Sequence, residues 1–178
     1  MSIKITYFVH GTTTDNEKGL STGWLPGELS KLGIKQAKEL GKLVSKKFDA
    51  FFSSDLKRAA DSAQLGFGNK YKIIKDKRLR ECNYGDFTGE AEKKVDYKKY
   101  IDTPFPNGES LKDVEERIKD FLNFLKKDYN NKHIATLAHK APQLALEVLV
   151  RGKTWEEAIK EDWRNTKSWQ PGWEYTIE

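Results

Sequence analysis

The sequence has too few cysteines for a disulfide framework and no apolar run long enough for a membrane span. Cys82 is the only cysteine among 178 residues, so no disulfide can form within the chain. No apolar stretch approaches the roughly 20 residues that a transmembrane helix requires. The first residues lack the apolar core and small-residue cleavage site of a signal peptide. These absences predict a protein of the reducing cytoplasm with no membrane partner.

The chain also lacks an arginine-rich tract with interleaved aromatic residues, so we expect no nucleic acid partner. Its net charge is +5, but lysines alternate with acidic residues along the segments expected to be helical. That pattern is typical of solvated helix faces, with a mild bias toward anionic ligands. The length and a hydrophobic content of 37% predict a single domain, residues 1–178, with a substantial core.

Apolar residues follow strand and helix periods in turn along the chain. Alternation or short apolar runs predict strands at residues 3–9, 50–53, 72–75, 134–138 and, at a sheet edge, 173–177. Helical spacing predicts helices at 30–48, 56–65, 110–125, 142–151 and from 154 onward, with Ser30, Asp55, Ser110 and Thr154 as caps and Pro142 in a first turn. The alternation predicts a three-layer α/β/α sandwich around a mostly parallel sheet.

Residues with chemical potential follow three of the predicted strands directly. His10, Ser53 and His139 stand at strand ends, where ligands bind in parallel sheets, so we expect them to converge on one edge. His10 is followed by Gly11 and by side-chain donors up to Asn16, a layout that suits a nucleophilic histidine facing a phosphate. The alternative for this segment alone is a loop histidine without a role. The irregular stretch 79–107 is long enough to be functional.

Four segments in this order and spacing resemble the histidine phosphatase superfamily, also called the phosphoglycerate mutase-like family. They are His10–Gly11, Ser53–Ala59, Leu79–Gly85 and Ala138–His139, and Pro106–Ser110 is similar to the family's Pro-x-Gly-Glu-Ser segment. The resemblance covers nearly the whole chain and implies the phosphoglycerate mutase-like fold, with no cofactor.

The resemblance assigns four catalytic roles, each with a physical basis. His10 matches the nucleophile that forms a phosphohistidine, and Arg58 matches a guanidinium that grips two phosphate oxygens. His139 matches the donor to the equatorial oxygens, and Glu81 matches the general acid for the leaving group. The alternatives are a surface arginine for Arg58 and a strand-end histidine satisfied by backbone for His139. For Glu81 the alternative is a salt bridge to Arg78 or Arg80.

Other matches are weaker. Polar or aromatic residues predicted to bind the substrate or its phosphate are Gly11, Asn16, Thr22, Gly23, Tyr84 and Lys140. His133 opens the late strand and is expected to be structural. No carboxylate–histidine spacing supports a metal site.

The sequence departs from the family pattern beside both catalytic histidines. Val9 stands where the family motif Arg-His-Gly has arginine, and losing one preorganised donor typically costs about 10²–10³ in rate. Lys140 stands where members often have glycine. Our hypothesis is that Lys140 restores part of the lost positive charge; the alternative is that it points to solvent at a helix start.

These features predict a phosphoric monoester hydrolase of the histidine acid type, with activity reduced by Val9, acting on a small phosphorylated substrate. The mutases that resemble this chain carry extra segments after the acid loop, whereas only about twenty residues separate Gly89 from Ser110 here. A phosphoglycerate mutase is therefore less favoured. The alternative from another class is a weakened or inactive member that binds a phosphorylated ligand or protein.

Four of the five tryptophans lie in the C-terminal quarter of the chain. Trp155, Trp163, Trp169 and Trp173 are predicted to pack as a cap on the sheet. The alternative is that this segment, with Arg164, Lys167 and Gln170, lines a substrate mouth or a partner surface.

Overall fold

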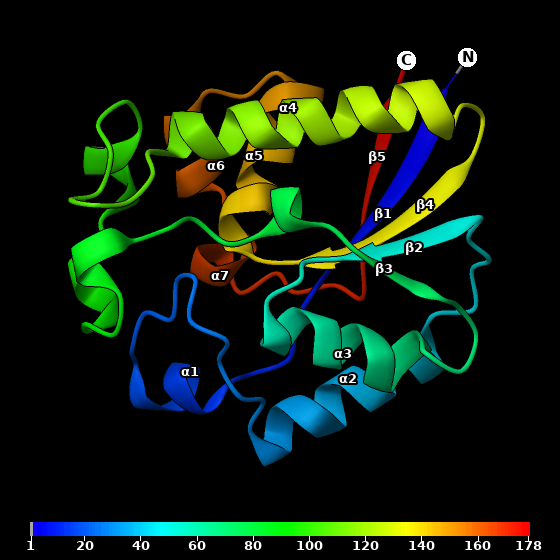
Figure 1. Ribbon diagram of the computed structural model, residues 1–178, viewed down its shortest axis with the longest axis horizontal. Coiled ribbons are helices and arrows are strands. Elements are labelled where there is room, and N and C mark those ends of the chain that lie inside the picture. Colours follow the sequence, from blue (N-terminus) through cyan, green and yellow to red (C-terminus); the bar gives the residue numbers. More distant parts are fainter. Residues whose placement is uncertain (1) are drawn as a thin grey trace.

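The computed structural model describes residues 2–178 and contains one five-stranded sheet between two layers of helices (Figure 1). The strand order is β3-β2-β4-β1-β5, and only the edge strand β5 runs antiparallel, against β1. The strands are β1 (Ile3–Val9), β2 (Ala50–Ser53), β3 (Ile73–Lys75), β4 (His133–Ala138) and β5 (Trp173–Ile177). The predicted α/β/α sandwich around a mostly parallel sheet is confirmed.

The two faces of the sheet are covered by different helices, as Figure 1 shows. Helices α2 (Lys31–Leu43) and α3 (Lys57–Phe67) cover one face; α4 (Leu111–Asp128), α5 (Lys140–Arg151) and α6 (Trp155–Lys160) cover the other. Because successive strand residues point to opposite faces, Phe8 joins the apolar cluster under α2 and α3 while Tyr7 joins the cluster under α4 and α5. Within residues 2–178, no helix combines the length and apolar character needed to cross a membrane.

Two predicted helix boundaries are wrong. The helix expected to reach Phe48 ends at Leu43, because the chain from Val44 is extended and carries the Phe48 ring back under the sheet against Phe8 and Phe51. The apolar residue at helical spacing therefore belongs to a core contact outside the helix. The next helix continues past Gly66 to Phe67, since Phe67 also packs on Phe51.

The predicted capping residues of two helices also differ from the structure. Asp55 does not cap α3, whose N-cap Leu56 makes no side-chain bond; the Asp55 carboxylate accepts two hydrogen bonds from Arg80 instead. Helix α5 begins at Lys140, two residues earlier than predicted, with Pro142 still inside its first turn. Ser110 and Thr154 form capping boxes at α4 and α6, as expected.

The long irregular stretch is a packed structure of single-turn helices. It contains the 3₁₀ turns η1 (Lys77–Leu79), η2 (Gly85–Phe87), η3 (Glu92–Lys94) and η4 (Tyr97–Tyr100). Arg117 of α4 holds its beginning, donating to the carbonyl oxygens of Arg78, Arg80 and Glu81 at 2.6–2.9 Å. A half-buried guanidinium with several acceptors fixes the backbone that carries Glu81.

The parallel register brings three strand ends to one edge of the sheet. Val9 pairs with Ala138, and Ser53 pairs with Leu137. His10 and His139, the next residues after Val9 and Ala138, therefore lie side by side at the ends of neighbouring strands, as predicted. The remaining short helices, α1 (Thr14–Lys18) and α7 (Trp163–Thr166), both lie near this edge (Figure 1).

Gly33 lets the loop after His10 lie directly on the first turn of α2. A Cβ at Gly33 would collide with the backbone carbonyl of Thr12, which cannot rotate away. We expect Gly33→Ala to lower the free energy of unfolding by about 1–2 kcal/mol, the overpacking cost less the gain in helix propensity. Denaturant titration measures this, with the exposed Lys38→Ala as control. An alanine variant as stable as the wild type would contradict the close contact.

Candidate active site

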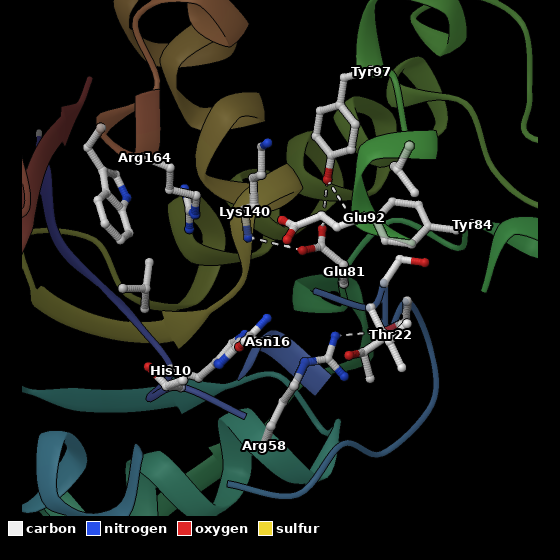
Figure 2. Close-up of a pocket in the computed structure, with 17 residues that line it drawn as sticks. His10, Asn16, Thr22, Arg58, Glu81, Tyr84, Glu92, Tyr97, Lys140 and Arg164 are labelled. Carbon is white, nitrogen blue, oxygen red and sulfur yellow. Dashed lines mark hydrogen bonds between the residues drawn. The ribbon is translucent and has the colours of Figure 1, made fainter. Parts of the chain in front are cut away.

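A cavity of about 290 Å³ opens at the edge of the sheet where the strand ends converge (Figure 2). Eight of the predicted site residues line it: His10, Asn16, Thr22, Gly23, Arg58, Glu81, Tyr84 and Lys140. Gly11 and His139 do not; both are buried next to His10. Val9, the residue before the histidine, also lines the cavity and offers it an apolar surface.

The His10 imidazole is held in one tautomer with its second nitrogen free. Its Nδ1 lies 2.7 Å from the carbonyl oxygen of Gly11. Because a carbonyl oxygen only accepts, Nδ1 carries the proton and the Nε2 lone pair is unprotonated in the neutral ring. Burial and then the Arg58 guanidinium lower the pKa of His10 to about 3. The ring is therefore neutral at pH 7, the state that a nucleophilic histidine requires.

His139 lies beside His10, with the two ring centroids 5.1 Å apart. Its Nε2 is 2.8 Å from the Ser54 hydroxyl, which already accepts a hydrogen bond from the Leu56 amide. A hydroxyl proton donated to Nε2 leaves the His139 proton on Nδ1, which has no partner among residues 2–178. A fully buried polar atom without a partner is costly and marks a place for a ligand oxygen.

The His139 ring is also neutral, and its backbone is fixed. Burial, followed by the neighbouring Arg58 and His10, lowers the pKa of His139 well below its usual range. The Tyr7 hydroxyl donates to the His139 carbonyl at 2.6 Å and accepts from its amide at 2.9 Å. Sequence analysis did not identify Tyr7 or Ser54 as site residues. Ser54 nevertheless lies in the segment Ser53–Ala59 that carries the family resemblance, and Tyr7 lies in the strand that leads to His10.

Arg58 enters the cavity from the first turn of α3 and is 2% exposed. Its Nη atoms donate to the carbonyl oxygens of Gly23, Leu25 and Pro26. A guanidinium has five N–H groups, so the Nε–H and one Nη2–H remain for a ligand. Burial lowers the pKa of Arg58 from its ordinary value, yet arginine stays charged. The alternative of a surface arginine is wrong.

The Glu81 carboxylate sits at the N-terminus of α5. Its Oε1 accepts from the amides of Cys82 and Ala141 at 2.9 Å, and its Oε2 accepts from the amide of Lys140 at 3.2 Å. The Tyr97 hydroxyl lies 3.4 Å from Oε1. These donors fix both oxygens at the wall of the cavity.

The alternative role of Glu81 as a salt-bridge partner is wrong. Arg78 pairs with Asp76 and Asp120, and Arg80 pairs with Asp55. Glu81 is thus paired with neither of the two arginines that precede it in the sequence, and its carboxylate remains available to the cavity.

The weaker matches line the cavity, but several of their polar atoms have structural partners. The Asn16 side chain caps α1 by accepting from the Thr13 amide, and the Thr22 hydroxyl donates to Asp15. The Tyr84 hydroxyl lies 2.7 Å from that of Tyr97. These residues shape the wall, and the Asn16 amide nitrogen is the group left to meet a ligand.

Lys140 directs its ammonium group to the cavity wall, not to open solvent. Its Nζ lies 3.5 Å from Asp162 and 4.6 Å from the centroid of the Tyr97 ring. Sequence analysis did not assign eight further lining residues, namely Thr12, Leu20, Ser21, Glu92, Val95, Tyr97, Trp163 and Arg164. It had raised Thr12 among the donors that follow Gly11, and Trp163 and Arg164 as members of a possible substrate mouth. Four of these eight residues lie in loops and four in the short helices η3, η4 and α7, where no periodicity points to a shared cavity.

The tryptophan-rich segment serves both of the purposes considered. Trp155 and Trp173 are buried in the core, as a packing cap requires, whereas Trp169 is 51% exposed. Trp163 stacks on Trp173 and lines the cavity at the same time. His133 lies away from the cavity and bonds the Thr6 hydroxyl at 2.8 Å, which agrees with its expected structural role.

Residues 7–174 match the family model of the histidine phosphatase superfamily (branch 1). The chain belongs to this superfamily. It is 29% identical to phosphoserine phosphatase 1 of Hydrogenobacter thermophilus, over 84% of this chain and 77% of that protein. It is 31% identical to a 2,3-bisphosphoglycerate-dependent phosphoglycerate mutase of Rhizobium meliloti, over 85% and 81%.

Other similar proteins are also phosphatases. The fructose-2,6-bisphosphatase TIGAR of Xenopus tropicalis is 41% identical, over 68% of this chain but only 49% of that protein. A solved structure of a phosphoserine phosphatase mutant from Entamoeba histolytica, in complex with phosphoserine, superposes with a TM-score of 0.77 at 25% identity, over 89% of this chain and 84% of that one. The superfamily predicted from the four motifs is confirmed, and the relatives are phosphatases and mutases.

The neutral histidines make stability depend on pH. His10 and His139 stay unprotonated in the folded protein, but in the unfolded chain they bind protons below about pH 6.5. Stability is therefore retained above pH 6.5 and falls as the pH is lowered toward 5, with a slope approaching about 1.4 kcal/mol per pH unit for each histidine.

Urea titrations between pH 7 and 5 measure this slope. Carboxylates with lowered pKa values, such as Asp55, contribute in the same direction only near and below pH 4, so they do not mask the effect. His10→Asn should reduce the slope by the share of one histidine, which approaches about 1.4 kcal/mol per pH unit. A free energy of unfolding that stays constant over this interval would contradict neutral buried rings.

Proposed function

We propose that this protein is a phosphomonoester hydrolase that acts through a phosphohistidine on His10. The observation that carries the proposal is the free Nε2 of a neutral imidazole facing a cavity shared with Arg58. In the first step, the Nε2 lone pair forms a bond to phosphorus as the bond from phosphorus to the ester oxygen breaks. The remaining Nε–H and Nη2–H of Arg58 and the Nδ1–H of His139 stabilise the three equatorial oxygens as charge develops.

Glu81 completes this step as general acid. A protonated Glu81 gives its proton to the departing alkoxide oxygen, and the alcohol leaves. In the second step, the Glu81 carboxylate takes a proton from a water molecule as its oxygen attacks phosphorus. The nitrogen–phosphorus bond breaks, inorganic phosphate is released, and Glu81 is protonated again for the next cycle. The cavity of about 290 Å³ suits a small phosphorylated substrate.

Two other functions have specific support. The apolar Val9 beside the nucleophile favours a member that binds a phosphorylated ligand without turnover. Against it, a site that only binds has no need of a His10 tautomer fixed by Gly11 or of a buried Ser54–His139 pair. The similarity to phosphoglycerate mutases supports a mutase, but the short segment between Gly89 and Ser110 is taken up by 3₁₀ turns and closely packed aromatic rings.

Hydrolysis of an aryl phosphate without added metal tests the nucleophile. We expect turnover by the wild type and a fall to the solution background with His10→Ala, because the proposed phosphohistidine forms on the Nε2 atom that this substitution removes. His133→Gln is the matched control, since that imidazole lies away from the cavity and its loss should leave the rate unchanged. After rapid quenching, mass spectrometry should detect one phosphoryl group on the wild type. Absence of turnover together with tight phosphate binding would favour the binding function instead.

Leaving-group dependence tests Glu81. With Glu81→Gln, kcat/KM for an alkyl phosphate should fall by about 10²–10⁴, because an alkoxide needs a proton to depart. The aryl phosphate should be affected much less, since a phenolate leaves without one, and it therefore serves as an internal control. Glutamine keeps one oxygen for the Cys82 and Ala141 amides, so the loop should retain its position. Equal losses on both substrates would contradict the general-acid role.

A further inference from the structure

The short helix α7 brings a second guanidinium to the cavity, on the side opposite Arg58. Figure 2 shows Arg58 entering from α3 and Arg164 entering from α7, and His10 lines the same cavity. The two side chains come from positions more than one hundred residues apart, and no motif connects them. Residues of the family resemblance account for Arg58 but not for Arg164.

Arg164 is held in place by contacts on two sides. Its Nη1 donates to Asp162 Oδ1 at 2.8 Å, and its guanidinium lies 4.4 Å from the centroid of the Trp163 ring. Trp163 is in turn stacked on the buried Trp173 and bonded through Nε1 to Gln143. A side chain fixed in this way loses little conformational entropy when it binds a ligand.

The charge around Asp162 leaves a net positive group facing the cavity. The Asp162 side chain is 1% exposed and lies against two cations, Arg164 and Lys140. One buried carboxylate neutralises one of them, so the cluster carries a residual charge of one. An incoming phosphomonoester dianion meets this charge in a cavity where the dielectric constant is lower than in water.

The free hydrogen-bond donors of the cluster belong to Arg164. Its Nε–H and Nη2–H groups have no acceptor among residues 2–178, and they add to the Nε–H and the one Nη2–H that Arg58 keeps free beside its bonds to loop carbonyls. Arg164 also acts on the nucleophile: after burial and Arg58, it contributes to lowering the pKa of His10. The Lys140 ammonium is instead turned toward the Tyr97 ring, 4.6 Å from its centroid.

We propose that Arg164 binds the phosphoryl group carried by the substrate, as the second guanidinium of the site beside Arg58. This assignment rests on the proposed function for its catalytic consequence, but phosphate binding can be measured without turnover. It revises the hypothesis that Lys140 replaces the missing charge, since the free fork of donors is on Arg164. Arg164 on α7 then supplies the guanidinium that the chain lacks at position 9, where valine stands in place of arginine.

Titration calorimetry with inorganic phosphate tests the assignment. Arg164→Gln should raise the dissociation constant by about 10- to 100-fold, the effect of losing hydrogen bonds from a charged donor. Lys167→Gln, an exposed position that also lies at the end of α7, removes the same charge and should change the constant by less than about twofold. Arg164 is partly exposed, and thermal unfolding of each variant verifies that it is folded.

A rescue experiment separates direct binding from an indirect structural effect. Val9 directly precedes His10 and lines the same cavity. Val9→Arg therefore places a guanidinium in the cavity from the end of β1 instead of from α7. If Arg164 binds the phosphate, Val9→Arg should restore affinity in Arg164→Gln and add much less in the wild-type background. Equal gains in both backgrounds, or a larger loss with Lys140→Met than with Arg164→Gln, would overturn the assignment.

The two proposals can fail separately. Phosphate binding that depends on Arg164 in a protein without His10-dependent turnover overturns the hydrolase and leaves this assignment standing. Turnover that depends on His10 but is unchanged in Arg164→Gln, with unchanged phosphate affinity, overturns this assignment and leaves the hydrolase standing.

Discussion

The parallel register between β1 and β4 is the constraint on which the site depends. Val9 pairs with Ala138, so each strand ends with a histidine as its next residue and the two imidazole rings lie 5.1 Å apart. Because side chains alternate along a strand, a slip of one residue would turn the core residues of β4 to the wrong face and separate the histidines. The Tyr7 hydroxyl, bonded to both the amide and the carbonyl of His139, locks this register at the strand end.

Beyond the strands, one buried and one half-buried arginine organise the loops. Arg58 donates hydrogen bonds to carbonyl oxygens within residues 23–26, and Arg117 donates to carbonyl oxygens within residues 78–81. Each guanidinium supplies several donors in a fixed plane, which irregular backbone needs once it is removed from water. The same Arg58 that positions the loop also faces the cavity, so the structure and the chemistry of this part of the site cannot be changed independently.

How far the sequence predicts this site depends on how each residue reaches it. His10 and His139 follow strands, and Arg58 opens a helix; period and topology are therefore enough to place them at one edge of the sheet. Ser53, predicted to join them, is the last residue of β2 with a buried hydroxyl, and the next residue, Ser54, bonds His139 instead. Helix ends are less predictable, since Phe48 continues a helical apolar spacing yet packs from an extended segment. Arg164 could not be assigned, because it stands on a four-residue helix whose position is set by tryptophan stacking and by the buried Asp162.

The cations of the cavity have two effects that support each other. A histidine nucleophile must be neutral when the phosphate arrives, and positive charges nearby penalise its protonated form. Arg58 and Arg164 therefore lower the pKa of His10 in the free protein while they provide the field that attracts a dianion. When the phosphate binds, its charge offsets theirs, and the pKa of His10 should rise. In the proposed mechanism, His10 Nε2 then becomes more nucleophilic without a general base beside the ring, while Nδ1 keeps its bond to the Gly11 carbonyl.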